Sequence, residues 1–526
     1  MSQVRLFHAN THRPSSQREL KVHRLDGTNG HLGRACGLLD GALDRYGVRL
    51  DRINRRYIDD HAVRSLELRT DFFGIDEVVT ALSIGEGLAA AAVAFHGRGN
   101  LADFPTSERK ERESRAKMEV DRAAASVHAF TNLELLRKVA GVHFVTAMAE
   151  GGRWKPGEAG SNPGSFLGQR IGDTRQIPIS VVRDDVDGTG KATRGNHSSF
   201  TSSLYTSSGV QRTLEDRYLF KIVSGQGFSE GSVVTPEDSY EAIVRALAGA
   251  NGVPLKDLNL FALVRPRHDA GNRIATGLGA NVIQDKDGDL IPGLSVSLRL
   301  YQYPHNDRPL HGMAQSGGAA EAGMLLPTIW RGGSVQLAYA GSDGVPEAGP
   351  SLAMSDIYRD PLAPGASFFG GITNNHHVPH LLGAQIKDDA MRVFVLGMSA
   401  DGRAWVDSMV FRYTYNRKVT DYRLLPLVGK ARLVNSDATA DQVIAEAFEV
   451  DALAAMREVE TDFYGVLEGE PGRWTVNEDA VRALSTPPKP GKPSRYDPRD
   501  IAILRSVQRH GERFFGPEDP GSPLFS

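Results

Sequence analysis

Hydrophobic and polar positions follow two successive patterns from residue 78 onward. Residues 78–95 and 113–139 are rich in Ala, Leu and other strong helix formers at helical spacing, which predicts two helices. The charged SERKERES between them predicts a solvated loop or a helix start. From residue 140 the runs GVHFVTAMAEGG, IPISVVRDDVDGTG and SSFTSSLYTSSG are short, rich in β-branched or aromatic residues and bounded by turns, which predicts strands.

The same alternation continues through the second half of the chain. Helical PEDSYEAIVRALAGANG precedes the apolar strand LNLFALVRPRHD, and strands and helices alternate to about residue 425, which favours a layered α/β fold. Residues 331–366, rich in Gly, Pro and Ser, predict a long excursion from that core. Beyond residue 430, DQVIAEAFEVDALAAMREVE and DPRDIAILRSVQRHGERFF predict two helices joined by an extended linker, STPPKPGKPSRYDP. Before residue 78 no pattern predicts an element.

A chain of 526 residues exceeds one compact core, so several structural units are expected. The patterns divide it into an N-terminal extension over 1–77, a first core half over 78–245 and a second core half over 246–425 that contains the excursion. A helical extension with a Pro-rich linker, 426–526, completes the chain.

Composition narrows the functional classes. An apolar content of 40% and a charged content of 24% are those of an ordinary globular protein, and a net charge of −3 offers no basic face for nucleic acid or anionic membranes. The single cysteine, Cys36, excludes an intrachain disulfide and a cysteine-based zinc cluster, which fits a reducing cytosol but would also fit a bacterial exported protein. The first residues lack the apolar core of a signal peptide, and the longest apolar run, GLAAAAVAF, is too short to cross a bilayer. We therefore expect a cytoplasmic protein without nucleic-acid or membrane partners.

Candidate chemistry centres on RDDVDGTGK at 183–191. Asp184 and Asp187 follow an apolar strand, at the kind of strand end where α/β folds commonly bind ligands. Two carboxylates three residues apart can converge on Mg²⁺ or Mn²⁺, because these hard cations prefer oxygen ligands. The alternative is a plain Asx/Gly turn, which is our interpretation of the similar LDGTNG at 25–30, since no apolar strand precedes it.

The residues after Asp187 suit an anion. Gly188 lets the backbone approach a bound phosphate, and Thr189 offers a hydroxyl. If a helical turn begins near Gly190, its amides would favour a phosphate there.

Two other constellations are set aside. DKDGD at 285–289 is excluded as an EF-hand calcium loop, because Leu290 and Val296 stand where that loop needs Gly and Glu. The histidine cluster TNNHHVPH has no acidic or cysteine partner at suitable spacing, so a surface or subunit-contact role is favoured over metal binding.

At this point the sequence resembles a known family. DDVDGT is similar to the Asp-x-x-Asp-Gly-Thr signature of the lithium-sensitive, metal-dependent sugar phosphatase superfamily, which includes inositol monophosphatases and fructose-1,6-bisphosphatases. Four later segments occur in the order and rough spacing of class II fructose-1,6-bisphosphatase, the bacterial type that includes sedoheptulose-bisphosphatases: RYLFKIVSGQG at 217–227, LVRPRHD at 263–269, DKDGD at 285–289 and GGAAEAG at 317–323. The resemblance spans roughly 78–425 and implies a layered αβαβα sandwich with N- and C-terminal extensions.

The resemblance implies one metal site and one substrate site. The metal ligands for Mg²⁺ or Mn²⁺, expected in the first core half, are Glu150, Asp184, Asp187 and Glu321, with Ala320 in place of the family's proline. Each of these acids could instead be a solvated surface residue. The second core half is expected to bind the sugar phosphate, and the implied substrate contacts are Gly188, Thr189, Tyr218, Arg265, Arg267, Asp287, Asp289 and Gly318.

Some of these contacts carry a further expectation. Arg265 stands where the family often has lysine, so a bidentate fork replaces a point charge. For both arginines the alternative is a surface ion pair. Asp287 and Asp289 are suited to accept hydrogen bonds from sugar hydroxyls.

The chain departs from the family pattern at two places. Ala116, next to Lys117, stands where the family is expected to have a metal-binding Asp, so that ligand is predicted to be missing unless Glu111 or Glu113 replaces it. In AEGGRWKPGE, Gly152 and Trp154 stand where the family has acids, and Glu158 is the candidate substitute.

The function implied is that of a phosphoric monoester hydrolase of carbohydrate metabolism, including gluconeogenesis, acting on a ketose bisphosphate such as fructose 1,6-bisphosphate or a related specialised sugar phosphate. Thr189, Asp187 and Glu150 are the expected catalytic residues, because they would hold the metal and position the attacking water. We expect a homo-oligomer whose ligand is a small sugar phosphate. The alternative, favoured by Ala116 and Trp154, is a catalytically weakened homologue that binds sugar phosphates in a regulatory or scaffolding role.

Overall fold

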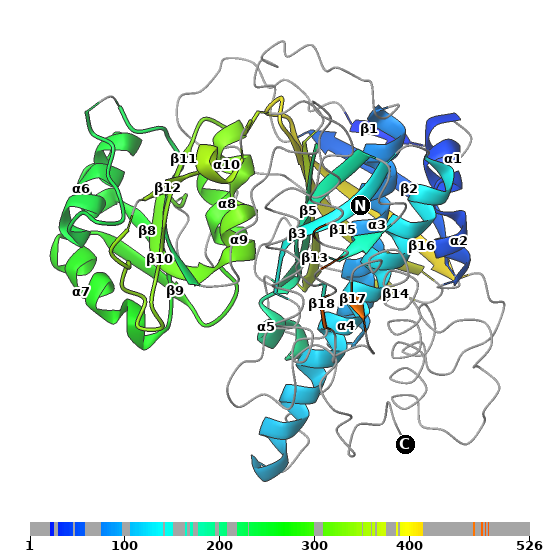
Figure 1. Ribbon diagram of the computed structural model, residues 1–526, viewed down its shortest axis with the longest axis horizontal. Coiled ribbons are helices and arrows are strands. Elements are labelled where there is room, and N and C mark those ends of the chain that lie inside the picture. The colour runs from blue at the N-terminus through cyan, green and yellow to red at the C-terminus, as the bar shows by residue number, and fades with distance from the viewer. Residues whose placement is uncertain are drawn as a thin grey trace.

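A computed structural model describes most of residues 22–413 (Figure 1). The described residues are 22–25, 30–45, 48–57, 75–96, 106–139, 142–150, 164–165, 169–171, 177–194, 199–207, 218–229, 231–298, 309–349, 351–358, 360–362, 366–374, 385–387, 390–413, 467–468, 475–476, 479 and 482. The two predicted C-terminal helices, their linker and the histidine cluster His376, His377 and His380 lie outside them.

The first sheet has ten strands and organises the larger part of the molecule. Among its described strand pairs, only β3 with β5 is parallel. Its order is β1 (Val22–Leu25), β2 (Val48–Tyr57), β16 (Ala404–Tyr413), β15 (Ala390–Ser399), β13 (Ser367–Asn374), β6 (Ser199–Ser207), β5 (Ile177–Asp187), β3 (Val142–Ala149) and β4 (Arg170–Ile171), with β14 (Gln385–Lys387) beside β15.

Two long helices, α3 (Ile75–His96) and α4 (Thr106–Lys138), pack together, and α3 covers one face of this sheet. The Ala-rich α3 is apolar nearly all round, as expected for a helix buried between a sheet and other helices. Gly371 on β13 permits this close packing, because a Cβ there would lie 2.6 Å from the Cβ of Ala90. The short α1 (Gly30–Gly37) and α2 (Asp40–Arg45) pack against α3 and α4, respectively. SERKERES is a helix start, since α4 includes it.

The second sheet forms the other half of the molecule, on the left in Figure 1. Its order is β12 (Leu352–Ala353), β11 (Ser334–Tyr339), β7 (Tyr218–Ser224), β10 (Gly312–Gly318), β8 (Asn259–Leu263) and β9 (Asn281–Asp285). Helices α6 (Tyr240–Asn251) and α7 (Asp269–Gly277) lie on its outer side. Helices α8 (Leu290–Leu298), α9 (Ala319–Gly323) and α10 (Leu326–Trp330) lie between the two sheets, and α9 contacts both.

Three of the buried hydrophobic clusters formed by the described residues lie between the layers. The first joins α3 and α4 to one face of the first sheet and includes Ile179 and Val181 of β5, whereas Val182 belongs to the second cluster, between the sheets. The third joins the second sheet to α6 and α7. Each sheet is therefore apolar on both faces, and the layers run helix, sheet, helix, sheet, helix. The predicted αβαβα sandwich is confirmed.

Two segments differ from the sequence-based prediction. The expected excursion at 331–366 contains β11, which pairs with β7 over six residues, so the prediction was wrong for that part. The dense Gly and Pro around the short SVQLAY run concealed its strand pattern. Before residue 78, where no element was predicted, β2 pairs with β16. Its sequence VRLDRINRRY is so rich in arginine that the apolar face is barely visible. The division of the chain into four units stays a prediction.

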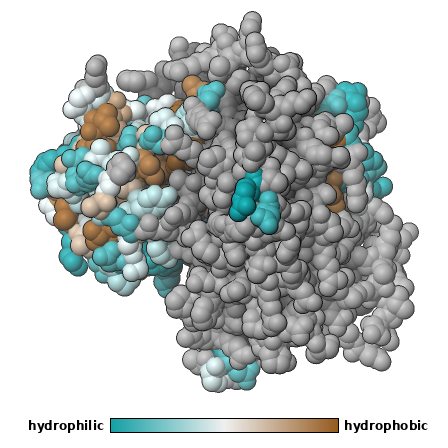
Figure 2. Space-filling view, in the orientation of Figure 1, coloured by the Kyte–Doolittle hydropathy of each residue, from teal (hydrophilic) through white to brown (hydrophobic). Residues whose placement is uncertain are grey.

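The described surface carries few large exposed apolar side chains: Val233, Val264, Ile274, Val345 and Leu362. On the visible face of the second-sheet half, hydrophobic residues alternate with hydrophilic ones (Figure 2). No helix within the described ranges has the length and apolar character needed to cross a membrane.

Candidate metal and phosphate site

The last residues of β5 carry the two predicted metal aspartates. In the pairing with β6, Asp184 lies opposite Ser202 and Asp187 opposite Phe200, so β5 contains one extra residue between them. Residues three apart on a regular strand point to opposite faces, and one inserted residue restores them to the same face. Both aspartates therefore point into the layer between the sheets.

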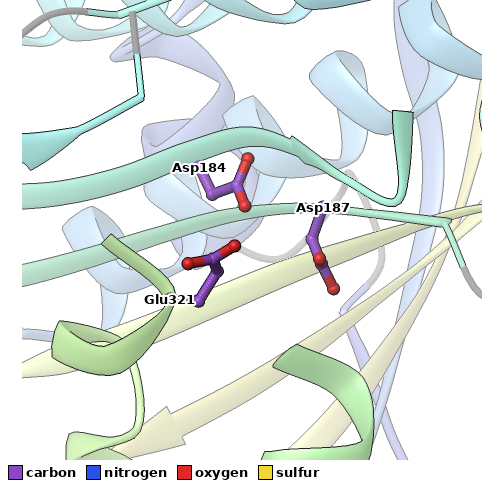
Figure 3. A group of neighbouring side chains, drawn as sticks. All are labelled: Asp184, Asp187 and Glu321. Carbon is purple, nitrogen blue, oxygen red and sulfur yellow. The ribbon is translucent and has the colours of Figure 1, made fainter. Parts of the chain in front are cut away.

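Asp184, Asp187 and Glu321 form one carboxylate group. One carboxylate oxygen from each residue lies within 4.8 Å of the corresponding oxygens of the other two. Among the described residues, this group has a geometry that could hold a metal ion. Glu321 comes from the first turn of α9, so the first and second sheets both border the site. Figure 3 shows the carboxylates of Asp184 and Glu321 facing each other, with Asp187 beside them.

Glu150, the fourth predicted ligand, lies next to this group. It follows β3, the parallel neighbour of β5, and its charge acts on Asp184. A Cβ at Gly318 would lie 3.0 Å from Glu150 Oε1 and would collide with the Glu321 carboxylate. The structure thus brings all four predicted acids together, and glycine at 318 makes room for two of them.

Asp121 of α4 is a fifth acid at the site, which the sequence analysis did not assign. Its Oδ1 accepts a hydrogen bond from Thr189 Oγ1 at 3.2 Å, and its charge also acts on Asp184. Glu113, a suggested substitute at the expected gap, instead pairs with Arg194 at 3.1 Å. In the sequence Asp121 stands close to Ala116, but only Glu111 and Glu113 were considered as substitutes for the missing ligand.

The carboxylates of the site repel one another. Burial raises the pKa of Asp184 well above its usual value, and the charges of Glu150 and Asp187 raise it further. Burial likewise raises the pKa of Asp187, with Asp289 and Glu321 acting in the same direction and Lys191 opposing them. Both aspartates are 4% exposed, so water screens this repulsion poorly. A bound cation would relieve it.

Asp187 is fixed from the second half of the molecule. The amides of Asp289 and Leu290, at the start of α8, donate to its two carboxylate oxygens at 3.3 and 3.0 Å. Gly288 permits this approach with φ 72°, and a Cβ there would lie 3.2 Å from Asp187 Oδ2.

The turn after Asp187 differs from the expectation. Helix α5 (Thr189–Thr193) begins after Gly188, which has φ 77°. The single hydroxyl hydrogen of Thr189 is shared between Asp121 and the Val186 carbonyl, whose oxygen lies 2.9 Å from Oγ1. The amide of Gly190, expected to favour a phosphate, donates to Asp287 Oδ2 at 3.0 Å. That expectation was wrong for Gly190, because Asp287 occupies the amide.

The two arginines lie in different surroundings. The Arg267 guanidinium lies 4.7 Å from the ring centre of Tyr218, and its Nε donates to Ser316 Oγ at 3.0 Å. Burial lowers its pKa, and the neighbouring Arg265 contributes in the same direction. Arg265 lies 3.5 Å from Asp287, so it forms the ion pair that the sequence left open as an alternative.

Asp289 lies deeper than a sugar contact would require. It is 2% exposed and pairs with the fully buried Lys221 at 3.0 Å, and Gln315 Nε2 donates to it at 2.8 Å. These contacts favour a supporting role beneath the site. The signal for Lys221 was present in the sequence, because a lysine inside the apolar strand YLFKIVS needs a buried partner.

Comparison with known proteins adds a family to this geometry. Residues 154–327 match the family described as bacterial fructose-1,6-bisphosphatase, glpX-encoded. Part of the chain is also similar to class 2 fructose-1,6-bisphosphatases. That of Haemophilus influenzae is 29% identical over 136 residues, which are 26% of this chain and 40% of that protein. Fructose-1,6-bisphosphatase 1 class 2 of Escherichia coli K12 is 27% identical over 134 residues, 26% of this chain and 39% of that protein.

The chain thus matches about two fifths of the length of these class 2 fructose-1,6-bisphosphatases. The family match is narrower than the expected 78–425, but it contains Asp184, Asp187 and Glu321 and every predicted substrate contact. Glu150 and Asp121 lie before it. Gly152, Trp154 and Glu158, where the chain departs from the family pattern, lie outside the described residues.

Proposed function

We propose that this protein hydrolyses a phosphate monoester of a sugar phosphate, most simply a ketose bisphosphate such as fructose 1,6-bisphosphate, with Mg²⁺ or Mn²⁺ as cofactor. The observation that carries the proposal is the convergence of Asp184, Asp187 and Glu321 between the two sheets, within the segment 154–327 that matches the bacterial fructose-1,6-bisphosphatase family.

The donor set fits a hard divalent cation. All its donors are carboxylate oxygens, the ligand type that Mg²⁺ and Mn²⁺ prefer over nitrogen or sulfur. The buried lysines whose charges reach these acids, Lys191 and Lys221, are each paired with another residue, Asp285 and Asp289. Excess negative charge at the site therefore favours a cation. When bound, such an ion polarises a phosphoryl oxygen and lowers the pKa of a coordinated water.

The chain's own residues supply orientation and charge. Glu150, Asp184, Asp187 and Glu321 would hold the metal, and Asp121 adds a carboxylate next to Thr189. The Thr189 hydroxyl, held between Asp121 and the Val186 carbonyl, would position the attacking water. Because phosphoryl transfer depends mainly on positioning and charge stabilisation, no covalent nucleophile is needed.

The part of the substrate away from the metal would bind to residues of the second-sheet half of the molecule. Arg267, fixed on the Tyr218 ring, would bind a phosphate group, with Arg265 at the edge of the same surface. Asp287 accepts hydrogen bonds from the Gly190 amide and the Arg265 guanidinium. It is more exposed than Asp289, the other predicted acceptor for sugar hydroxyls. A cytoplasmic location, a homo-oligomeric state and a role in gluconeogenesis stay predictions.

Phosphate release from a panel of sugar mono- and bisphosphates, with Mg²⁺ or Mn²⁺, tests this proposal. We expect turnover of at least one ketose bisphosphate, and loss of it in Asp187→Ala and Thr189→Ala. If the protein binds these sugar phosphates but releases phosphate from none of them, the enzyme proposal fails and a binding protein with a regulatory or scaffolding role replaces it.

A further inference from the structure

The aspartate between the two proposed ligands points away from the site. Asp185 and Val186 occupy the bulge of β5, where two successive residues can face the same side. Val186 packs with Val93 of α3 and Val120 of α4, on the helix-covered face of the sheet. Asp185 reaches His128 of α4 on that same face. The bulge thus turns its middle residues toward the helices and its flanking aspartates toward the site.

Three hydrogen bonds hold the Asp185 carboxylate. His128 Nδ1 lies 2.7 Å from Oδ1, Ser165 Oγ donates to Oδ1 at 3.1 Å, and the Ser165 amide donates to Oδ2. Asp185 is 6% exposed and His128 is 2% exposed. A buried carboxylate anchored in this way cannot rotate freely, so the backbone of the bulge is fixed with it.

His128 is itself fixed from a second helix. Its Nε2 lies 3.2 Å from Oε1 of Glu86 on α3, and Glu86 is 2% exposed. Both ring nitrogens thus face carboxylate oxygens, and ionised carboxylates accept hydrogen bonds, so this geometry favours a ring that donates from both nitrogens. Removal of His128 would leave the buried Asp185 and Glu86 carboxylates without this hydrogen-bonding partner, a costly state that a rearrangement of the bulge would relieve.

We infer that His128 is a positioning residue, which acts through Asp185 to hold the β5 bulge and so keeps Asp184 and Asp187 on one side of the strand. This inference rests on the proposed function, since it gives these two aspartates the role of metal ligands. Groups behind the ligands commonly orient them, and their loss typically weakens metal affinity or activity about 10- to 100-fold.

The inference is tested by measuring the affinity of the full-length protein for Mn²⁺ by calorimetry, in the absence of any substrate. We expect His128→Ala to bind Mn²⁺ about 10- to 100-fold more weakly than the unaltered protein. His128→Asn should recover much of the affinity, because its side-chain amide can donate to Asp185 from nearly the place of Nδ1. Glu86→Gln, which keeps the His128–Asp185 contact, should lose less than His128→Ala.

Ser83→Ala is the matched control. Ser83 of α3 is fully buried in the same layer and donates to Asp407 Oδ2 at 2.7 Å, so its loss removes a buried hydrogen bond without touching Asp185. We expect it to bind Mn²⁺ like the unaltered protein. Circular dichroism shows whether His128→Ala folds. If it does not, the inference is tested by comparing His128→Asn with Asp185→Ala, since only Asp185→Ala should lose Mn²⁺ affinity strongly.

Two outcomes would overturn the inference alone: unchanged Mn²⁺ affinity in His128→Ala, or an equal loss in Ser83→Ala. Absence of Mn²⁺ binding and of phosphate release in the unaltered protein would instead overturn the proposed function, and the inference with it.

Discussion

At the scale of single residues, the site consists of buried charges whose neighbours decide their state. Asp184 and Asp187 repel one another and the nearby glutamates, whereas Asp289 forms an ion pair with Lys221. The same residue type therefore serves two purposes a few ångströms apart. Acids that repel one another favour a bound cation, and the ion-paired Asp289 lies beneath them.

Asp121 should contribute to the proposed metal-dependent activity even though it lies before the family match at 154–327. We expect Asp121→Asn, which preserves shape and can still accept the Thr189 hydrogen bond, to lower kcat/KM by about 10- to 100-fold through loss of charge. Ala116→Asp, which adds an acid at the position that the sequence marked as deficient, should change it by no more than about two-fold. A large gain from Ala116→Asp would show that Asp121 does not supply the carboxylate needed.

The buried Lys221–Asp289 pair should be costly to break and cheap to replace. Lys221→Met leaves Asp289 buried without its cation, so the free energy of unfolding should fall by about 3–5 kcal/mol. The double variant Lys221→Met/Asp289→Leu should regain much of that loss, because no buried charge is left alone. Urea unfolding curves measure both. A double variant as unstable as the single one would argue against the pair as the source of the cost.

At the scale of elements, short irregularities in strands and turns place the functional groups. The bulge in β5 brings two aspartates to one face, and the turn at Gly288 aims the start of α8 at Asp187. Regular strands and helices build the layers, but these local departures from regularity build the site.

Gly288 should therefore tolerate no side chain. Gly288→Ala places a Cβ at φ 72° and 3.2 Å from Asp187 Oδ2, so we expect a loss of about 1–2 kcal/mol in the free energy of unfolding and weaker Mn²⁺ binding. Gly249→Ala is the control, because Gly249 lies inside α6 with open space around its Cβ position. It should stabilise the protein by about 0.5–1 kcal/mol. Equal effects of the two substitutions on Mn²⁺ binding would contradict the role given to the Gly288 turn.

The stability of the junction between α3, α4 and β5 should depend on pH, because His128 titrates there. Burial lowers the pKa of His128, but the charge of Glu86 and hydrogen bonds to Asp185 and Glu86 outweigh burial and the opposing charge of Arg183. The pKa is therefore raised above its ordinary value of 6.5, with Tyr205 of β6 as a further titratable group nearby. The contribution to stability is full below 6.5 and is lost as pH rises through the folded-state pKa.

The prediction is tested by measuring the melting temperatures of the unaltered protein and of His128→Gln at pH values below and above 6.5. The difference between them should shrink as pH rises above 6.5. A difference that grows over the same range would have the wrong sign and would contradict a charged His128.

The sequence predicted the elements of the core well, for a physical reason. Strands buried on both faces are continuous apolar runs, and the Ala-rich helix α3 is apolar all round, so both are visible without knowledge of their partners. Strands β2 and β11 were missed because charged or Gly-rich surroundings conceal a short pattern. A one-residue bulge leaves no trace in the pattern, so the side to which Asp185 points could not be predicted.

At the scale of the whole molecule, the site lies where the two sheets meet. Lys191 of α5 pairs with Asp285 of β9 at 2.8 Å, and Gly190 donates to Asp287, so side chains and backbone from both halves meet around Asp187. The family resemblance named residues on each side of this boundary. Asp121, Lys221 and His128 were not assigned. The apolar strand around Lys221 indicated that this lysine needs a buried partner, but which residues the three contact depends on packing across layers, which linear spacing does not reveal.

The central claim is that acids from both halves hold a divalent cation that is required for phosphate-ester hydrolysis. The most direct measurement is phosphate release from fructose 1,6-bisphosphate by protein stripped of metal and then titrated with Mn²⁺, alongside Asp187→Asn. We predict no release without metal, restoration by Mn²⁺ and at least about a hundred-fold loss in Asp187→Asn. Release at the same rate without metal, or equal activity of Asp187→Asn, would contradict the claim.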